Sequence, residues 1–128
     1  QLQKEREESQ NPGVTKDAVH EARSYIDAHY SDDNLSVEML ADIAGLSPAY
    51  FGKLFFTTVH VSCNDYLMEL RLRKAAELLA ETQDTVSTIS QAVGINSTNY
   101  FYIVFKKKYG CTPVQYRRQI KEEQENGK

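Results

Sequence analysis

The side chains with the clearest chemical capacity in this sequence are cations gathered in one segment. Residues 85–118 contain no aspartate or glutamate. They carry instead the five cations Lys106, Lys107, Lys108, Arg117 and Arg118. Clustered ammonium and guanidinium groups bind phosphate, and charges are screened beyond about 8 Å at physiological salt. The segment therefore predicts a surface for a polyanion, despite the chain's net charge of −3.

In the segment that holds the first repeat, acidic residues outnumber the cations. Residues 14–60 hold the three cations Lys16, Arg23 and Lys53 against the seven acids Asp17, Glu21, Asp27, Asp32, Asp33, Glu38 and Asp42. We therefore expect the second repeat to be the electrostatic anchor.

Catalytic and metal-binding patterns are weak by comparison. The serines and the three histidines form no recognisable pairing of a nucleophile with a base. His60 and Cys63 have the spacing of a shared metal site but lack a second pair nearby. Cys63 and Cys111 are typical of partly buried thiols in a reducing cytosol. We therefore expect a protein that is not an enzyme and that binds no metal or cofactor. A small helical enzyme is kept as an alternative, although no residues can be assigned to its active site.

An internal repeat predicts the elements that position the cations. Residues 36–46 align with residues 85–95 at an offset of 49, and after one inserted residue the offset becomes 50. At the second offset Ser47, Tyr50, Phe51, Phe55 and Tyr66 fall on Ser97, Tyr100, Phe101, Phe105 and Tyr116. A repeat of this length is one supersecondary unit used twice. The six aromatic residues at positions 51, 55, 66, 101, 105 and 116 are expected in the core.

Each copy predicts a short helix, a tight turn and a second helix. Ser36 and Thr85 are N-cap residues for the first helix. Gly45 and Gly94 supply the turn, where a positive φ is needed. Ser47, followed by a proline, and the equivalent Ser97 then open the second helix. Each repeat is therefore a helix-turn-helix.

The remaining segments complete an all-α chain of about seven helices. Ser62 predicts the cap of a long helix to about residue 81, and an amphipathic helix is expected at 15–29. Residues 112–115 predict a capping box for a last helix to about 119. The predicted organisation is a linker or tail at 1–13, a first helix-turn-helix subdomain at 14–60, a linking helix at 61–82, a second subdomain at 83–119 and a disordered tail at 120–128.

Several stretches carry a family resemblance. They are residues 40–47, the Phe51 and Phe55 pair, Tyr66 with Arg71 and Ala75, Leu78 with Leu79, residues 97–101, residues 105–113, and Tyr116 with Arg117. Through them the chain from about 15 to 118 resembles the DNA-binding domain of the AraC/XylS family of bacterial transcription regulators. The resemblance implies two helix-turn-helix units whose second helices enter successive major grooves, about 34 Å apart. A linking helix of roughly 18 residues, about 27 Å long, is of the right order.

The resemblance also implies the residues that contact DNA. Base-reading positions would be Ala49, Tyr50, Gly52 and Lys53 in the first unit and Thr98, Asn99, Tyr102 and Ile103 in the second. Phosphate contacts would come from Ser36, Thr57, Thr85, Lys106, Lys107, Thr112 and Arg117. Lys53 suits a guanine edge, Ala49 a thymine methyl group and Asn99 an adenine. Many family members carry a basic residue in place of Ile103, and a glycine in place of His60. Arg71 is expected to tie helices together.

The partners follow from the same resemblance. We expect double-stranded promoter or operator DNA, RNA polymerase, and an upstream sensing or receiver domain that controls dimerisation. The domain itself would be monomeric, cytoplasmic and without membrane contact. The full-length protein would be an activator of transcription, which is the commoner behaviour in this family. Because the chain begins with Gln1, we expect a fragment of a longer protein. The thin reading face around Ala49 and Gly52 leaves one alternative, a helical protein-interaction module with weakened DNA contacts.

Overall fold

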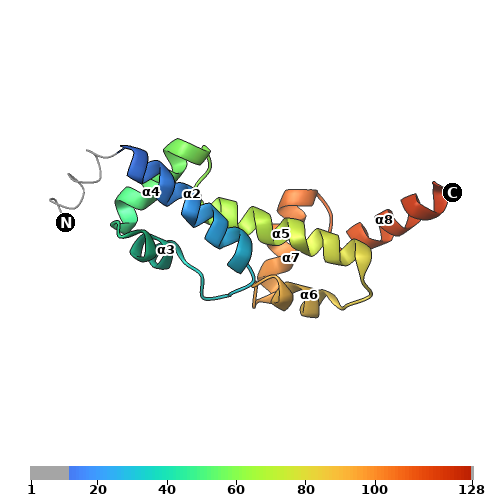
Figure 1. The fold of residues 1–128 in the computed structure, drawn as a ribbon. Helices are drawn as coiled ribbons and strands as arrows, with labels where there is room; N and C mark the ends of the chain where they lie inside the picture. Colours follow the sequence, from blue (N-terminus) through green and yellow to red (C-terminus); the bar gives the residue numbers. More distant parts are fainter. Residues whose placement is uncertain (1–11, 128) are drawn as a thin grey trace. The chain divides into compact units, whose positions relative to one another are not determined.

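The computed structural model describes residues 12–127, and all regular structure in this range is helical. The helices, labelled in Figure 1, are α2 (Pro12–His29), α3 (Val37–Ala44), α4 (Pro48–Val59), α5 (Cys63–Glu81), α6 (Val86–Ala92), α7 (Thr98–Tyr109) and α8 (Pro113–Asn126). The all-α class is therefore confirmed. None of these helices is both long and apolar enough to span a membrane.

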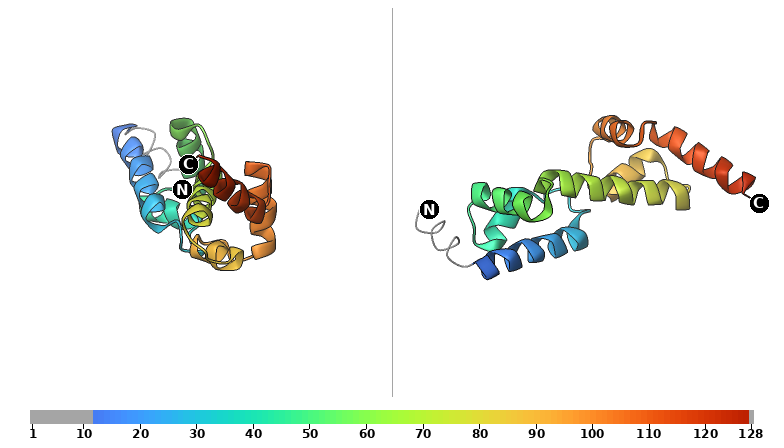
Figure 2. Two further views of the ribbon diagram at one scale, coloured as in Figure 1. Left: turned by 90° about the vertical axis from the view of Figure 1, so that its right-hand side faces the viewer. Right: turned by 90° about the horizontal axis from the view of Figure 1, so that it is seen from above.

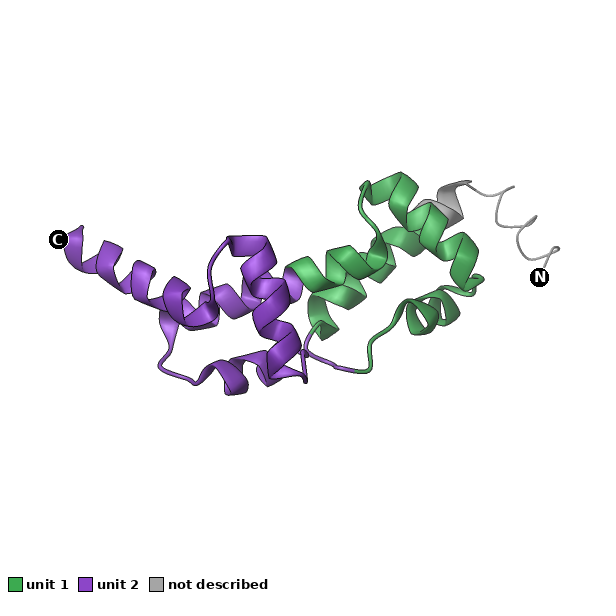
Figure 3. Cartoon of the chain, turned by 180° about the vertical axis from the view of Figure 1, so that it is seen from behind, with its two compact units in different colours: residues 1–30, 34–69 green, residues 31–33, 70–128 purple. Residues whose placement is uncertain are grey.

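The chain divides into two compact units (Figure 3). The first contains residues up to Tyr30 and residues 34–69, and the second contains residues 31–33 and 70–128. Helix α5 contributes its first part to one unit and the rest to the other. Each unit contains one helix-turn-helix.

In the first unit, α4 packs against both α2 and α3 (Figures 1 and 2). Phe51 and Phe55 of α4 are fully buried with Ile26 of α2 and Leu40 of α3. The ring of Tyr66, from the first part of α5, meets Phe55 edge-on at 5.7 Å between centroids. Its hydroxyl donates to the Asp27 carboxylate of α2.

The second unit repeats this arrangement, with α7 packed against α6 and α8. Phe101 and Phe105 of α7 are fully buried, as are Ile89 of α6 and Pro113 at the start of α8. Tyr116 of α8 meets Phe105 edge-on at 5.5 Å, as its equivalent does in the first unit. The predicted aromatic core is therefore confirmed in both repeats, with the two tyrosines half-buried at its edge.

The predicted helix starts and turns are also confirmed. The hydroxyls of Ser36, Ser47, Thr85, Ser97 and Thr112 each accept the backbone N–H three residues further on, at the N-cap of α3, α4, α6, α7 and α8. Ser62 does the same for α5. In the turns, Gly45 has φ 73° and Gly94 has φ 92°.

Two helix boundaries differ from the prediction. Helix α8 continues to Asn126 rather than ending near 119, so the tail predicted at 120–128 is wrong as far as the described residues reach. The residues after 119 are mainly good helix formers, and glycine first appears at Gly127. Helix α2 begins at Pro12 rather than near 15, because proline fits the first turn of a helix. The rest of the predicted N-terminal tail lies outside the described residues.

Candidate nucleic-acid interface

Helix α4 presents one face to its core and another to solvent. Phe51 and Phe55 fix the buried face. On the other side Ala49 and Lys53 are exposed, while Tyr50 and Gly52 are half-buried. The four predicted base-reading residues of the first unit therefore all reach the surface, and Lys53 carries the charge among them.

Gly52 adds no side chain to this face. A Cβ atom placed on Gly52 would have no neighbouring atom within 4 Å. The glycine is therefore not required by packing within the unit, although glycine inside a helix costs about 0.5–1 kcal/mol relative to alanine.

Helix α7 has the same two-sided construction. Phe101 and Phe105 are buried, whereas Asn99 and Ile103 are exposed on the opposite side. Thr98 is half-buried, and its hydroxyl lies 3.4 Å from that of Ser87 in α6. Tyr102 is also half-buried. Asn99 and Ile103 are therefore the accessible members of the predicted reading set in this unit.

The repeat places different chemistry at equivalent positions of the two helices. In α4 the positions four residues apart are Ala49, Lys53 and Thr57, all exposed. In α7 the equivalents are Asn99, Ile103 and Lys107, also exposed. We call these rows the α4 stripe and the α7 stripe. Residues four apart lie on the same helix face, so each stripe forms one continuous contact surface.

Cations gather at the C-terminal end of α7. Lys106, Lys107 and Lys108 occupy its last turn, where positive charge is stabilised by the helix dipole. The Lys108 ammonium lies 5.6 Å from the centre of the Tyr109 ring. Lys106 and Lys107 are exposed. These two lysines are therefore placed to meet an anion in solution.

The predicted phosphate ligand Arg117 has a structural position. Its Nε donates to the carbonyl of Leu79 at 2.9 Å, and one Nη donates to the carbonyl of Thr82 at 3.1 Å. These bonds join α8 to the end of α5, where helix carbonyls lack intrahelical partners. A phosphate contact by Arg117 remains a prediction, and it would have to use the N–H groups that these two bonds leave.

The other predicted phosphate contacts are Thr57 and the backbone amides at the helix starts near Ser36, Thr85 and Thr112. Ser36, Thr85 and Thr112 act as N-caps, so each lies at the start of a helix where backbone N–H groups favour anions. The Thr57 hydroxyl donates to the Lys53 carbonyl at 2.8 Å within α4. The hydroxyl oxygen can still accept a hydrogen bond, but the hydroxyl proton is already donated to this carbonyl.

One polar cluster of the second unit was not predicted from the sequence. Arg71, only 8% exposed, donates to the carbonyl of Asp32 at 2.8 Å. Asn96, next to the turn between α6 and α7, donates to the Asp33 carboxylate. Burial lowers the pKa of Arg71, and the charges of Asp32 and Asp33 oppose that shift. Arg71 therefore has a structural role, as expected, but this bond joins α5 to the non-helical segment 31–33, whereas the sequence predicted a tie between helices.

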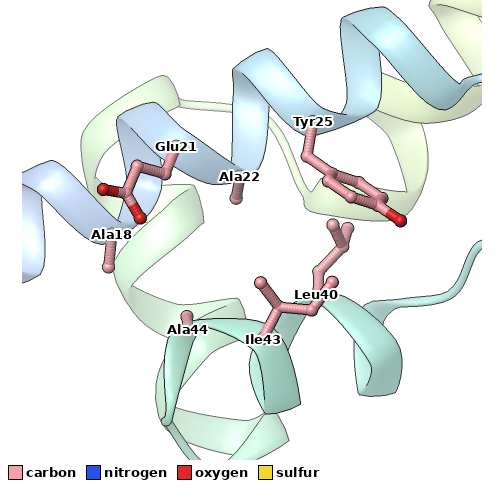
Figure 4. Close-up of a pocket in the computed structure, with 7 residues that line it drawn as sticks. All are labelled: Ala18, Glu21, Ala22, Tyr25, Leu40, Ile43 and Ala44. Carbon is pink, nitrogen blue, oxygen red and sulfur yellow. The ribbon is translucent and has the colours of Figure 1, made fainter.

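An apolar pocket lies between α2 and α3 in the first unit (Figure 4). It has a volume of about 180 Å³. Its lining residues are Ala18, Glu21, Ala22, Tyr25, Leu40, Ile43 and Ala44. Ile43 points from α3 towards α2 in the close-up, yet it is 57% exposed. This surface belongs to the acidic half of the sequence.

The residues with metal or nucleophilic chemistry are dispersed. Within residues 12–127, no three histidine, cysteine, aspartate or glutamate side chains come together as a metal site. Burial raises the pKa of the Cys63 thiol to about 11, so this thiol stays protonated at neutral pH.

Comparison with known proteins identifies several similar chains. A family model described as a helix-turn-helix domain matches residues 40–119. The regulatory protein PocR of Salmonella typhimurium is 39% identical over 104 residues, which cover 81% of this chain and 34% of PocR. The xylose operon regulatory protein of Escherichia coli K12 is 34% identical over 113 residues, covering 88% of this chain and 29% of that protein.

A solved structure has the same fold as this chain. The C-terminal domain of AraT, a response regulator from Geobacillus stearothermophilus, is 36% identical and superimposes with a TM-score of 0.78. The match covers 80% of this chain and 84% of that domain. The chain spans about a third of PocR and somewhat less of the xylose regulator, but most of the isolated AraT domain.

Proposed function

Because the chain belongs to the AraC/XylS family of helix-turn-helix regulators, we propose that it binds double-stranded DNA sequence-specifically as an output domain, with α4 and α7 in successive major grooves. The observation that carries this proposal is the repeated construction of the two helices. Each is anchored by two buried phenylalanines and turns a stripe of accessible side chains to solvent. A helix is the element that fits the major groove of B-form DNA.

The accessible side chains divide between bases and backbone. Lys53 suits the guanine O6 and N7 acceptors, and Asn99 suits the adenine N6 and N7 pair. Lys106 and Lys107 fit phosphates, since they end α7 in a segment that contains no acid. Base contacts then supply specificity, while the lysines supply affinity that depends on salt.

The whole protein is proposed to regulate transcription from a bacterial promoter. We propose activation rather than repression, because activation is the commoner behaviour in this family. Its upstream part would sense a small molecule or act as a phosphorylated receiver. The names of the relatives include both kinds of input, a xylose operon regulator and a response regulator. Dimerisation through that part would raise avidity for DNA without changing the contacts of this domain.

The first test is affinity selection of the 128-residue chain on random duplex DNA at two salt concentrations, followed by sequencing. We expect two short motifs about one helical turn apart and an affinity that falls steeply with salt. A single motif would mean that only one helix reads bases. Absence of enrichment and of salt dependence would contradict DNA binding by this domain.

The pocket between α2 and α3 favours a second function, contact with RNA polymerase. Ile43 offers an exposed apolar anchor, and Glu21 lies at the pocket wall. Exposed Asp17 and Asp42 add negative charge on the same two helices. This combination suits a basic polymerase surface that inserts one apolar side chain, because complementary charge steers association.

A pair of substitutions separates this function from DNA binding. Ile43→Ser with Glu21→Lys should lower transcription from a promoter in vitro while leaving operator affinity unchanged. The matched control is Val114→Ser, another exposed apolar residue but on α8. Unchanged transcription with the double variant would contradict the polymerase contact.

A further inference from the structure

Ile103 is the most exposed large hydrophobic side chain among the described residues. It is 65% exposed, although it lies in the middle of α7, between the buried Phe101 and Phe105. Neither packing nor helix formation within the unit requires an isoleucine there, because β-branched residues are weaker helix formers than leucine or lysine. The equivalent residue of α4 is Lys53, which has the polar head expected on a surface.

The neighbours of Ile103 on the α7 stripe define what it can contact. Asn99 lies one turn before it and Lys107 one turn after it, and both are exposed. On B-form DNA these side chains would match three groups in the same order. Asn99 would meet an adenine edge, Ile103 an apolar group and Lys107 a phosphate. The apolar group that base pairs present in the major groove is the C5 methyl of thymine.

We infer that Ile103 is a specificity-determining residue that packs on a thymine C5 methyl next to the adenine bound by Asn99. The inference rests on the proposed function, because it requires α7 to lie in the major groove. It gives the α7 half-site an A·T composition. The α4 half-site, read by Lys53, contains a guanine instead.

Replacement of thymine by uracil tests the contact, since it removes only the methyl group. Each thymine of the selected duplex is changed in turn, and the dissociation constant is measured for the unaltered chain. We expect one position in the α7 half-site to lose about fourfold in affinity, the value for burial of one methyl-sized group. Uracil at the remaining thymine positions of the α7 half-site should leave the affinity nearly unchanged.

The Ile103→Ala variant identifies the side chain responsible. It should bind the thymine and the uracil duplex at that position almost equally. Val114→Ala is the matched control, because Val114 is also an exposed apolar residue but lies on α8 and not on a reading helix. That variant should keep the fourfold difference. Ile103→Lys, which copies the α4 residue, should shift the preference at this position towards guanine.

The outcomes separate the inference from the proposed function. Sequence-specific binding with equal affinity for every uracil duplex would overturn the methyl contact alone. Persistence of the fourfold difference in Ile103→Ala would do the same. Failure of the chain to select any duplex would overturn the proposed function and this inference together.

Discussion

His60 ends α4 in a conformation that side chains normally avoid. Its φ is 71°, and among the described residues it is the one non-glycine with a positive φ. Gly110 ends α7 in the same way, with φ 78° and the same N–H bond to the carbonyl four residues before it. The cap that family resemblance associates with glycine therefore forms here with histidine, at a conformational cost.

The substitution His60→Gly should relieve this cost. We expect the free energy of unfolding to rise by about 1 kcal/mol, the difference between glycine and an L-residue in the left-handed region. Urea denaturation followed by circular dichroism measures it. The reciprocal variant Gly110→His should lower the stability by a similar amount. A destabilised His60→Gly protein would indicate that the imidazole makes contacts worth more than the strain.

Gly52 supports a prediction with two readouts. Gly52→Ala should raise the free energy of unfolding by about 0.5–1 kcal/mol, because a helix favours alanine and the added Cβ meets no atom within 4 Å. Operator affinity should fall in the same variant, because we expect DNA to approach the α4 backbone closely at the glycine. Thermal denaturation and a binding titration check the two effects separately. Unchanged affinity would mean that DNA does not approach α4 closely at Gly52.

At the scale of helices, the starts were predictable because their signals are local. A capping hydroxyl acts on an amide three residues away, so Ser36, Ser47 and Thr112 identify their helices from sequence alone. The end of α8 was missed since no breaker marks position 119 and helix formers continue to 126. The bonds of Arg117 and Arg71 span more than thirty residues, a separation at which local periodicity carries no information.

The candidate site was predictable to a similar degree. The family resemblance proposed the faces of α4 and α7, and the exposed stripes agree with it for Lys53, Asn99 and Ile103. The role of each of these side chains on DNA stays a prediction, which the substitutions test one by one. The contact between Thr98 and Ser87 could not be predicted, since it depends on how α6 and α7 pack.

Arg71 is the clearest test of the link between helix α5 and the segment 31–33. Arg71→Met keeps much of the buried aliphatic volume but removes the bond to the Asp32 carbonyl. We expect a loss of about 1.5–3 kcal/mol in the free energy of unfolding, the range for hydrogen bonds to charged groups. Arg73→Met, two residues along the same helix but exposed, is the control and should change little. Equal effects of both variants would contradict a special role for Arg71.

At the scale of the whole molecule, acidic residues outnumber the cations around the first repeat, whereas residues 85–118 hold exposed lysines and no aspartate or glutamate. A protein with a net negative charge can therefore still bind a polyanion through its second repeat. Lys106→Gln with Lys107→Gln should weaken binding to all duplexes alike. The slope of log affinity against log salt should become shallower by about 1.8, at roughly 0.9 for each phosphate that the variant no longer neutralises. Filter-binding titrations over a range of salt measure this slope. Lys121→Gln on α8 is the control, and an unchanged slope in the double variant would exclude both lysines from phosphate binding.

The difference between the α4 stripe and the α7 stripe has a consequence for how a promoter is arranged. A symmetric dimer reads a palindrome. Because a palindrome is identical in both directions, it does not fix the orientation of the bound protein on the DNA. Ala49, Lys53 and Thr57 cannot exchange places with Asn99, Ile103 and Lys107, so a site matched to both is read one way round. Reversing the operator in place would turn the bound protein end for end, so that the surface around Ile43, which we propose contacts RNA polymerase, would point the other way along the DNA.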